Sequence, residues 1–226
     1  MPLAALSVRL VPAVLAAAVL AGGLAASTLA RAESASMDCG SSKREKGDPD
    51  GRVKRVGEHG YRIRLADREI RLHDKPPYDE PLSGTRYEYC GQVAGYWLFD
   101  EAADGMFGGL LVDQRTGARL PAGQQVVFSP DRRAYLATVQ PDGLDGMEWY
   151  VYAVDGARVS WHGYNFIPRR DTKELASDAD LSDPRWTDKG VLQATATCWG
   201  GTKTWTVSLV DRGRGWDWSP APRCKH

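Results

Sequence analysis

Short runs in which apolar and polar residues alternate recur along most of the chain. A period of two is typical of β-strands that bury one face against a core. The clearest runs, in chain order, are YRIRL, REIRL, YWLF, GLLVD, AYLATV, WYVYAV, VLQATA and TWTVSLV. This pattern predicts an all-β protein, and helical periodicity is nearly absent from it.

Turn-forming residues separate these runs. Asp-Gly pairs occur at 50–51, 104–105, 142–143, 145–146 and 155–156, and such pairs favour tight hairpin turns between antiparallel strands. The one candidate helix, residues 170–180, is polar on most faces, which favours a surface turn or loop. The expected architecture is therefore a set of antiparallel hairpins.

Two parts of the chain resemble each other, residues 126–161 and 185–216. Aligning them places Phe128 on Trp186 and the strand YVYAVDG on TVSLVDRG. A looser third unit, 95–120, keeps only a strand, a loop, a second strand and a turn that contains glycine. Self-similarity of this kind is the signature of a repeating sheet.

The segment FSPDRRAYLATVQPDGLDGMEWYVYAVDG resembles the WD-like repeat of bacterial periplasmic β-propellers, such as the one in the Tol translocation system. Arg132 stands where that family usually has glycine, so we expect a turn that depends less on glycine. The wider run from GYWLFDE to FSPDRRAYLA is similar to small exported bacterial proteins of unknown function that carry a few such units. The resemblance implies a fold and brings no catalytic residue.

A propeller blade needs about 40–45 residues, so residues 33–226 have room for about four blades at most. We expect these residues to form a single all-β domain with a propeller-like or incomplete propeller sheet assembly. The alternative is a twisted β-sandwich.

The first 32 residues indicate export. Arg9 precedes a long stretch of alanine, leucine and valine, and Ala30-Arg31-Ala32 matches an A-x-A cleavage pattern. We interpret 1–32 as a signal peptide that is removed before Glu33, in preference to a membrane anchor. The prediction is a periplasmic or secreted bacterial protein with no membrane span after cleavage.

The balance of charges along the sequence argues against nucleic acid and anionic membranes as partners. The chain has 29 basic and 29 acidic residues, and loss of Arg9 and Arg31 with the leader leaves 27 basic against 29 acidic. A near-neutral chain with interspersed signs gives no electrostatic footprint for nucleic acid or for an anionic membrane.

All four cysteines lie in the exported part, and an even number in an oxidising compartment predicts two disulfides. Of three possible pairings we favour Cys39–Cys90 with Cys198–Cys224, because each bond then closes one end of the domain. No metal site is predicted, since there is no C-x-x-C and the four histidines (His59, His73, His162 and His226) lack ligand spacing.

An acidic loop offers oxygen ligands. Asp142, Asp145 and Glu148 lie within seven residues, and such groups could coordinate calcium. The favoured interpretation is that the Asp-Gly pairs serve the hairpin turn itself. Asp100, Glu101 and Asp104 form a second acidic loop, which is interpreted in the same two ways, as calcium ligands or as part of a hairpin turn. Calcium is the one cofactor that the sequence suggests, and the favoured expectation is that none is bound.

Aromatic residues supply the other candidates for binding. Trp216 and Trp218 lie two apart in GWDWSP and would form an exposed platform for a sugar ring, although most of the eight tryptophans are expected in the core. Ser83 and Tyr87, in SGTRY, resemble the loop that periplasmic C-type lysozyme inhibitors insert into the enzyme. His162, next to the sole asparagine Asn165, either lines a pocket or serves a structural role.

Three functions remain open. The first is a non-catalytic binding protein of the periplasm whose partner is an unknown protein or glycan and whose hairpin loops bind it. The second is an inhibitor or immunity-type protein against a cell-wall hydrolase. The third is a hydrolase acting on glycans, although the sequence contains no recognisable catalytic motif.

Overall fold

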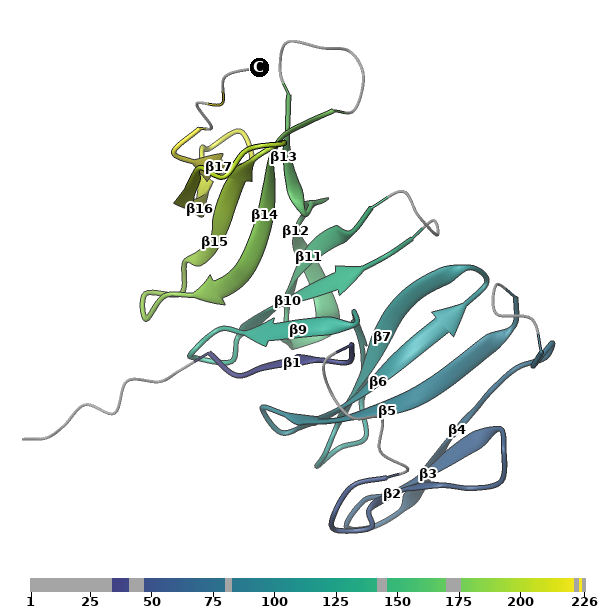
Figure 1. The fold of residues 1–226 in the computed structure, drawn as a ribbon. Helices are drawn as coiled ribbons and strands as arrows, with labels where there is room; N and C mark the ends of the chain where they lie inside the picture. Colours follow the sequence, from purple (N-terminus) through teal and green to yellow (C-terminus); the bar gives the residue numbers. More distant parts are fainter. Residues whose placement is uncertain are drawn as a thin grey trace, which may run out of the picture. The chain divides into compact units, whose positions relative to one another are not determined.

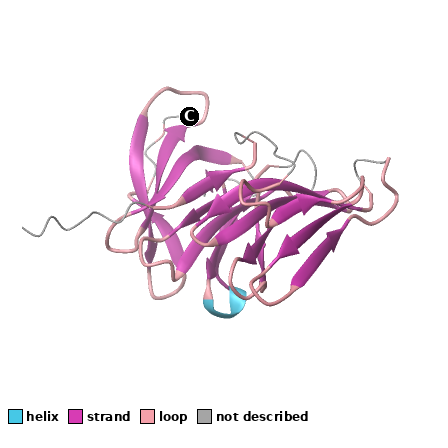
Figure 2. Cartoon of the chain, turned by 90° about the horizontal axis from the view of Figure 1, so that it is seen from below, coloured by secondary structure: helices cyan, strands magenta, loops and turns pink. Residues whose placement is uncertain are grey.

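The computed structural model describes residues 34–40, 47–79, 83–141, 146–169, 176–221 and 224. The predicted signal peptide lies outside these residues, and all of the strands belong to one compact unit, Arg31–His226. One 3-10 turn, Asp155–Ala157, is the single helical element of the described part (Figure 2). No helix among the described residues is long and apolar enough to cross a membrane. The all-β prediction is confirmed.

The strands form four antiparallel sheets, numbered first to fourth along the chain (Figure 1). The first contains β2 (Val53–Arg55), β3 (Gly60–Arg64) and β4 (Glu69–His73). The second contains β5 (Thr85–Val93), β6 (Tyr96–Ala103), β7 (Met106–Asp113) and β8 (Arg119–Ala122). The third contains β1 (Ser36–Asp38), β9 (Gln125–Phe128), β10 (Ala134–Val139), β11 (Glu148–Ala153) and β12 (Arg158–Tyr164). The fourth contains β13 (Phe166–Pro168), β14 (Ser177–Trp186), β15 (Leu192–Cys198), β16 (Thr204–Asp211) and β17 (Trp216–Ser219).

Within each sheet, strands that are consecutive in the chain are neighbours in space, as in a propeller blade. The exception is β1, which leaves the N-terminal region and pairs with β9, so that Ser36 lies opposite Val127. This pairing joins segments about ninety residues apart. It gives the third sheet a fifth strand.

Each sheet shares a hydrophobic core with the next sheet along the chain. The first core joins the first and second sheets and contains Val53, Ile63, Leu72, Trp97, Phe99 and Val112. The second core joins the second and third sheets and contains Leu98, Leu111, Val126, Phe128 and Tyr135. The third core joins the third and fourth sheets and contains Leu136, Trp149, Leu181, Ala194, Val207 and Trp218. None of the three clusters among the described residues combines the first sheet with the fourth. This chain of shared cores is the propeller-like sheet assembly that the sequence predicts.

The two predicted repeat units fold alike. Strands β9 to β12 and strands β14 to β17 have the same order, and each set gains an extra antiparallel strand on its first member, β1 on β9 and β13 on β14. The looser unit, 95–120, supplies β6, β7 and the first half of β8 in the second sheet, while the first strand of that sheet, β5, precedes the unit.

The turn after the first strand is also similar in both units, although the hydroxyl-bearing residue and the amide are 5 residues apart in one and 4 in the other. Ser129 Oγ accepts a hydrogen bond from the Ala134 amide at 3.0 Å, and Thr187 Oγ1 accepts one from the Val191 amide at 3.1 Å. In each turn a hydroxyl therefore accepts from a backbone amide at, or directly before, the start of the next strand. The sequence alignment thus reflects shared hydrogen bonding.

Arg132 corrects one expectation about this turn. Its φ is +57°, while Gly190 at the equivalent place has φ +72°. The turn has kept its left-handed residue, and arginine adopts a conformation that costs about 1–2 kcal/mol for a residue with a Cβ atom. The expectation of a turn that depends less on glycine is wrong.

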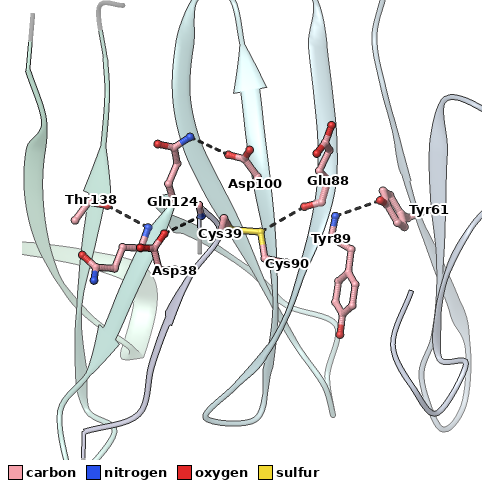
Figure 3. The surroundings of a disulfide bond; sticks show 11 residues. Asp38, Cys39, Tyr61, Glu88, Tyr89, Cys90, Asp100, Gln124 and Thr138 are labelled. Atoms are coloured by element: carbon pink, nitrogen blue, oxygen red, sulfur yellow. Dashed lines mark hydrogen bonds between the residues drawn. A yellow bond between two sulfur atoms is a disulfide. The ribbon is translucent and has the colours of Figure 1, made fainter. Parts of the chain in front are cut away.

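Both disulfides pair as predicted. Cys39, directly after β1, is bonded to Cys90 of β5 with the two Cα atoms 5.1 Å apart, so this bond fastens the third sheet to the second (Figure 3). Beside it, the Cys39 amide donates to the Gln124 carbonyl. The second bond joins Cys198 to Cys224 at a Cα distance of 5.6 Å and fastens the chain end to the fourth sheet.

The predicted turn or loop at 170–180 is wrong over its described part. Residues 170–175 lie outside that part, but residues 177–180 begin the ten-residue strand β14. The strand is hard to recognise from sequence, because among the residues of β14 only Ala179 and Leu181 are buried and most of the others are polar.

Candidate functional site

The two tryptophans of β17 do not form the predicted platform. Trp216 is 47% exposed, whereas Trp218 is only 5% exposed and packs edge-on against the rings of Trp149 and Trp161. Both side chains lie on the same face of the strand. Trp218, however, is paired with Leu209 over the third core, while Trp216 is paired with Asp211 at the strand end. The proposed exposed pair is therefore corrected to one buried and one exposed tryptophan.

The acidic loop is described only in part, because Asp142 and Asp145 lie outside the described residues. Glu148 belongs to β11, and its Oε2 accepts the Tyr150 hydroxyl at 2.6 Å and faces His162 Nε2 at 3.0 Å. The Tyr150 and His162 rings stack at 4.3 Å. Burial, followed by the hydrogen bond to Glu148, raises the pKa of the Tyr150 phenol. Glu148 thus serves a local side-chain cluster, and the described residues contain no group of three or more His, Cys, Asp or Glu that could hold a metal ion.

Ser83 and Tyr87 lie on either side of the start of β5, so the SGTRY segment enters a strand. Gly84, with φ +72°, is needed there because a Cβ atom would lie 2.4 Å from the Lys75 carbonyl oxygen. Tyr87 is half-buried, and burial together with a hydrogen bond to Glu101 raises its phenol pKa to about 12. Ser83, by contrast, lines a pocket.

This pocket, of about 530 Å³, lies where the first and second sheets meet. Its wall is built by the turn between β2 and β3, the connection from β4 to β5, and the first half of β5. Its charged and aromatic lining includes Arg55, His59, Asp74, Tyr78, Arg86 and Glu88. A volume of this size lies in the usual range for small-molecule sites.

Asp74 is the fixed centre of the pocket floor. Its side chain is 3% exposed, and its Oδ1 accepts the Tyr87 amide at 3.0 Å. Its Oδ2 lies 3.4 Å from Arg55 Nη2 and 3.8 Å from His59 Nδ1. A buried carboxylate needs such partners, because an unpaired charge away from water is costly.

Arg55 connects this carboxylate to the neighbouring backbone. Its Nη1 donates to the Tyr87 carbonyl at 3.0 Å, and its Nη2 also donates to the Glu58 carbonyl. The guanidinium lies over the Tyr61 ring at 4.8 Å. These contacts join the turn between β2 and β3 to β5, so the floor of the pocket is held in place before any ligand arrives.

The groups that face the opening are aromatic and charged. The His59 and Tyr78 rings stack nearly parallel, with centroids 3.7 Å apart, and Tyr78 is 50% exposed. Across the pocket, Arg86 Nε lies 3.6 Å from Glu88 Oε1. The pocket therefore offers one flat ring surface with donors and acceptors around it.

A second hollow, of about 890 Å³, lies on the fourth sheet and is more open. It is lined in part by Ser34, whose Oγ donates to the Trp186 carbonyl at 3.2 Å and accepts from the Trp186 amide at 3.3 Å. Trp186 Nε1 donates to the Val127 carbonyl instead of facing the hollow. This surface has no central fixed group comparable to Asp74.

The pocket was not foreseen from the sequence, apart from Ser83. His59, Asp74 and Tyr78 belong to two different turns, and nothing in their spacing brings them together. The segment HDKPPYDE, which combines prolines with an aromatic and acids, is the one local signal that could have drawn attention to this connection. Comparison of the chain with protein-family models, curated proteins and solved structures gave no match. The site is accordingly interpreted from its own geometry.

Proposed function

We propose that this protein is an exported, non-catalytic binding protein and that the pocket between its first and second sheets holds part of a glycan. The observation that carries the proposal is the exposed ring of Tyr78, stacked on His59 above a hydrogen-bonded floor. A preorganised site of this kind binds without losing much entropy of its own side chains.

The surroundings of Tyr78 suit a sugar. An aromatic ring presents an apolar face to the C–H side of a pyranose. Glu88, Asp79 and the hydroxyl-bearing residues Ser83 and Thr85 lie around the same opening and suit sugar hydroxyl groups. Arg86 adds a cation, which favours sugars that carry a carboxylate.

Export is supported by two independent features. The A-x-A pattern at 30–32 matches a signal cleavage site. The two disulfides fit an oxidising compartment outside the cytoplasm. The resemblance to periplasmic propeller repeats agrees with both features.

The inhibitor and hydrolase hypotheses gain no specific support. An inserting loop would need Ser83 and Tyr87 to project together, whereas Tyr87 is part of β5 and half-buried. Glycoside hydrolysis needs two carboxyl groups about 5–10 Å apart on either side of the bond that is cleaved. Among the described acids around the pocket, Asp74 is already engaged by Arg55 and the Tyr87 amide.

The test is binding of a panel of neutral, N-acetylated and acidic oligosaccharides, measured by saturation-transfer NMR and calorimetry. We expect Tyr78→Ala to weaken binding about five- to tenfold, since it removes the stacking surface. Trp199→Ala is the matched control, because Trp199 is 66% exposed and lies on the fourth sheet, away from the pocket.

Four outcomes would contradict the proposal. The first is that no member of the panel binds, and the second is that Tyr78→Ala and Trp199→Ala behave alike. Turnover of a glycan that is lost in Glu88→Gln would favour the hydrolase hypothesis, and inhibition of a muramidase that is lost in Ser83→Ala would favour the inhibitor hypothesis.

A further inference from the structure

The first sheet has one apolar face and one charged face. Val53, Tyr61, Ile63 and Leu72 point into the first core. Because side chains alternate along a strand, the residues between them point the other way. The outward residues are Lys54 on β2, Arg62 and Arg64 on β3, and Glu69, Arg71 and His73 on β4. We call these six residues the basic face.

Three cations of the basic face stand in a single row across the sheet. The strand register places Lys54 opposite Arg62, and Arg62 opposite Arg71. Like charges at directly opposed positions destabilise a sheet. A sequence under selection for stability alone would not be expected to keep three of them there.

Glu69 compensates only part of this charge. Its two carboxylate oxygens lie 3.5 Å from Arg62 Nε and 3.2 Å from Arg71 Nε. No ion pair with a described residue involves Lys54 or Arg64, and both are exposed. Four basic side chains against one acid leave the face with three positive charges in excess, without counting His73.

A neighbouring strand extends the same surface. Arg119 of β8 donates from Nη2 to the Arg71 carbonyl at 3.0 Å, which places a fifth cation at its rim. The neutral total charge of the chain conceals this segregation. The expectation that no anionic surface is favoured was based on that total and did not take account of how the charges are distributed on this face.

The basic face is separate from the pocket. Arg55 of the pocket points inward, toward Tyr61, and alternates along β2 with the outward Lys54. A ligand in the pocket and a partner on the basic face therefore use different sides of the first sheet.

We propose that the basic face docks the protein on the surface of an anionic phospholipid bilayer. The backbone positions that carry the cations extend in two directions, with strands about 4.8 Å apart and with Arg62 and Arg64 about 7 Å apart along β3. An array in two directions fits a plane of phosphate groups better than it fits a single linear polyanion. No Trp, Tyr or Phe lies among the outward residues of these strands, so neither stacking on sugars or bases nor insertion into the acyl region is offered.

The experiment measures co-sedimentation with vesicles of phosphatidylcholine alone and with phosphatidylglycerol added. The protein is the processed chain from residue 33, since the apolar leader would itself bind lipid and all strands belong to the unit Arg31–His226. We expect binding only to the anionic vesicles and a steep loss of binding as salt is raised.

Two variants act in opposite directions. Lys54→Gln combined with Arg64→Gln removes the two cations that form no ion pair with a described residue and should weaken binding roughly twenty-five-fold, at about fivefold per charge. Glu69→Gln removes the one acid and should strengthen binding about fivefold. The matched control is Lys203→Gln combined with Arg214→Gln, one lysine and one arginine that are exposed on the fourth sheet, which should leave binding unchanged.

The results that overturn the proposal are distinct from any failure of glycan binding in the pocket. Absence of binding to anionic vesicles overturns it, as does an equal loss in the control variant. Binding to soluble dextran sulfate that follows the same variants, without binding to vesicles, would replace the bilayer with a linear polyanion. Circular dichroism of each variant separates loss of binding from loss of fold.

Discussion

The third and fourth sheets share a strand order but differ in which residues of their strands are buried. In β10 of the third sheet, the four consecutive residues Tyr135 to Thr138 are all buried. In the equivalent β15 of the fourth sheet, burial alternates, so that Ala194 is buried and Thr195 is only partly so. The same strand order has therefore produced two patterns of burial.

The difference follows from position along the array of sheets. The third sheet contributes to two cores, with Tyr135 in one and Leu136 in the other. The fourth sheet contributes to one. A strand with neighbours on both faces needs a continuous apolar run, and a strand with one covered face needs only alternation. The same reasoning explains why the first sheet, which also contributes to one core, carries charge on its other face.

The aromatic residues differ in the same way. The third sheet stacks tyrosines, with Tyr135 and Tyr152 at 5.2 Å and Tyr150 and Tyr152 at 5.9 Å. Strands β13 to β17 contain no tyrosine and carry tryptophans instead. A tyrosine can lie in a shared core when its hydroxyl finds an acceptor, as Tyr135 does with the Pro121 carbonyl at 2.6 Å.

Truncation of neighbouring side chains should show the largest contrast. In the third sheet, Tyr135→Ala and Leu136→Ala should each lower the free energy of unfolding by about 2–5 kcal/mol, because both faces are packed. In the fourth sheet, Val207→Ala should cost about 2 kcal/mol and Thr206→Ala, which is exposed, less than about 0.5 kcal/mol. Urea unfolding measures all four, and equal costs for Val207 and Thr206 would contradict the one-faced interpretation.

Removal of each disulfide should have the next largest effect. The loops that they close span 51 and 26 residues. On chain-entropy grounds, Cys39→Ala with Cys90→Ala should cost about 4 kcal/mol and Cys198→Ala with Cys224→Ala about 3.5 kcal/mol. Thermal unfolding of the two double variants is the measurement. A larger loss for the second pair would mean that the bond within the fourth sheet does more than restrict the unfolded chain.

Alkaline pH should lower the stability of the fold, in part through buried tyrosines of the third sheet. Burial raises the folded pKa of the Tyr135 and Tyr152 phenols above the unfolded value of about 10. The stability that they contribute is complete below pH 10 and is lost as the pH rises toward their folded pKa values. Stability should thus fall above about pH 10, and Tyr152→Phe should reduce this fall. An unchanged pH profile in that variant would mean that other groups cause the loss.

The smallest expected effect concerns the left-handed position of the shared turn. Arg132→Gly should raise the free energy of unfolding by a few tenths to about 1 kcal/mol, because glycine adopts positive φ without a Cβ penalty but is freer when unfolded. Gly190→Ala should lower it by about 1 kcal/mol, since no other atom lies within 4 Å of the added Cβ and backbone strain alone is tested. A destabilised Arg132→Gly variant would show that the arginine side chain makes a compensating interaction.

Sequence alone was sufficient where a pattern is local. The strands expected from the runs at β3, β10, β11 and β16 are present, although burial in β10 is continuous and does not alternate. Both cysteine pairs are as predicted. Strand β14 was missed because its outward residues are polar and the register of its pairing shifts between Ser182 and Arg185. The exposure of Trp216 and Trp218 was misjudged because alternation gives the face of a strand and not how far the neighbouring sheet extends over it.

The two proposed sites differ in how far the sequence could have revealed them. The basic face could in principle have been predicted from the sequence, since Arg62, Arg64 and Arg71 alternate with apolar residues in YRIRL and REIRL. What was missing is the register that sets Lys54, Arg62 and Arg71 side by side. The pocket could not have been predicted from the sequence, because His59 and Tyr78 come into contact only in the folded chain.

The order of the cysteines has a consequence for biosynthesis. The bonds join the first cysteine to the second and the third to the fourth. A chain that enters an oxidising compartment N-terminus first presents Cys39 and Cys90 there before Cys198 arrives, so oxidation in order of arrival gives the native connectivity without reshuffling. Strand β1 appears long before its partner β9, and the bond to β5 keeps it beside the second sheet until β9 is made. The Cys39–Cys90 disulfide thus keeps β1 in position until β9 can pair with it.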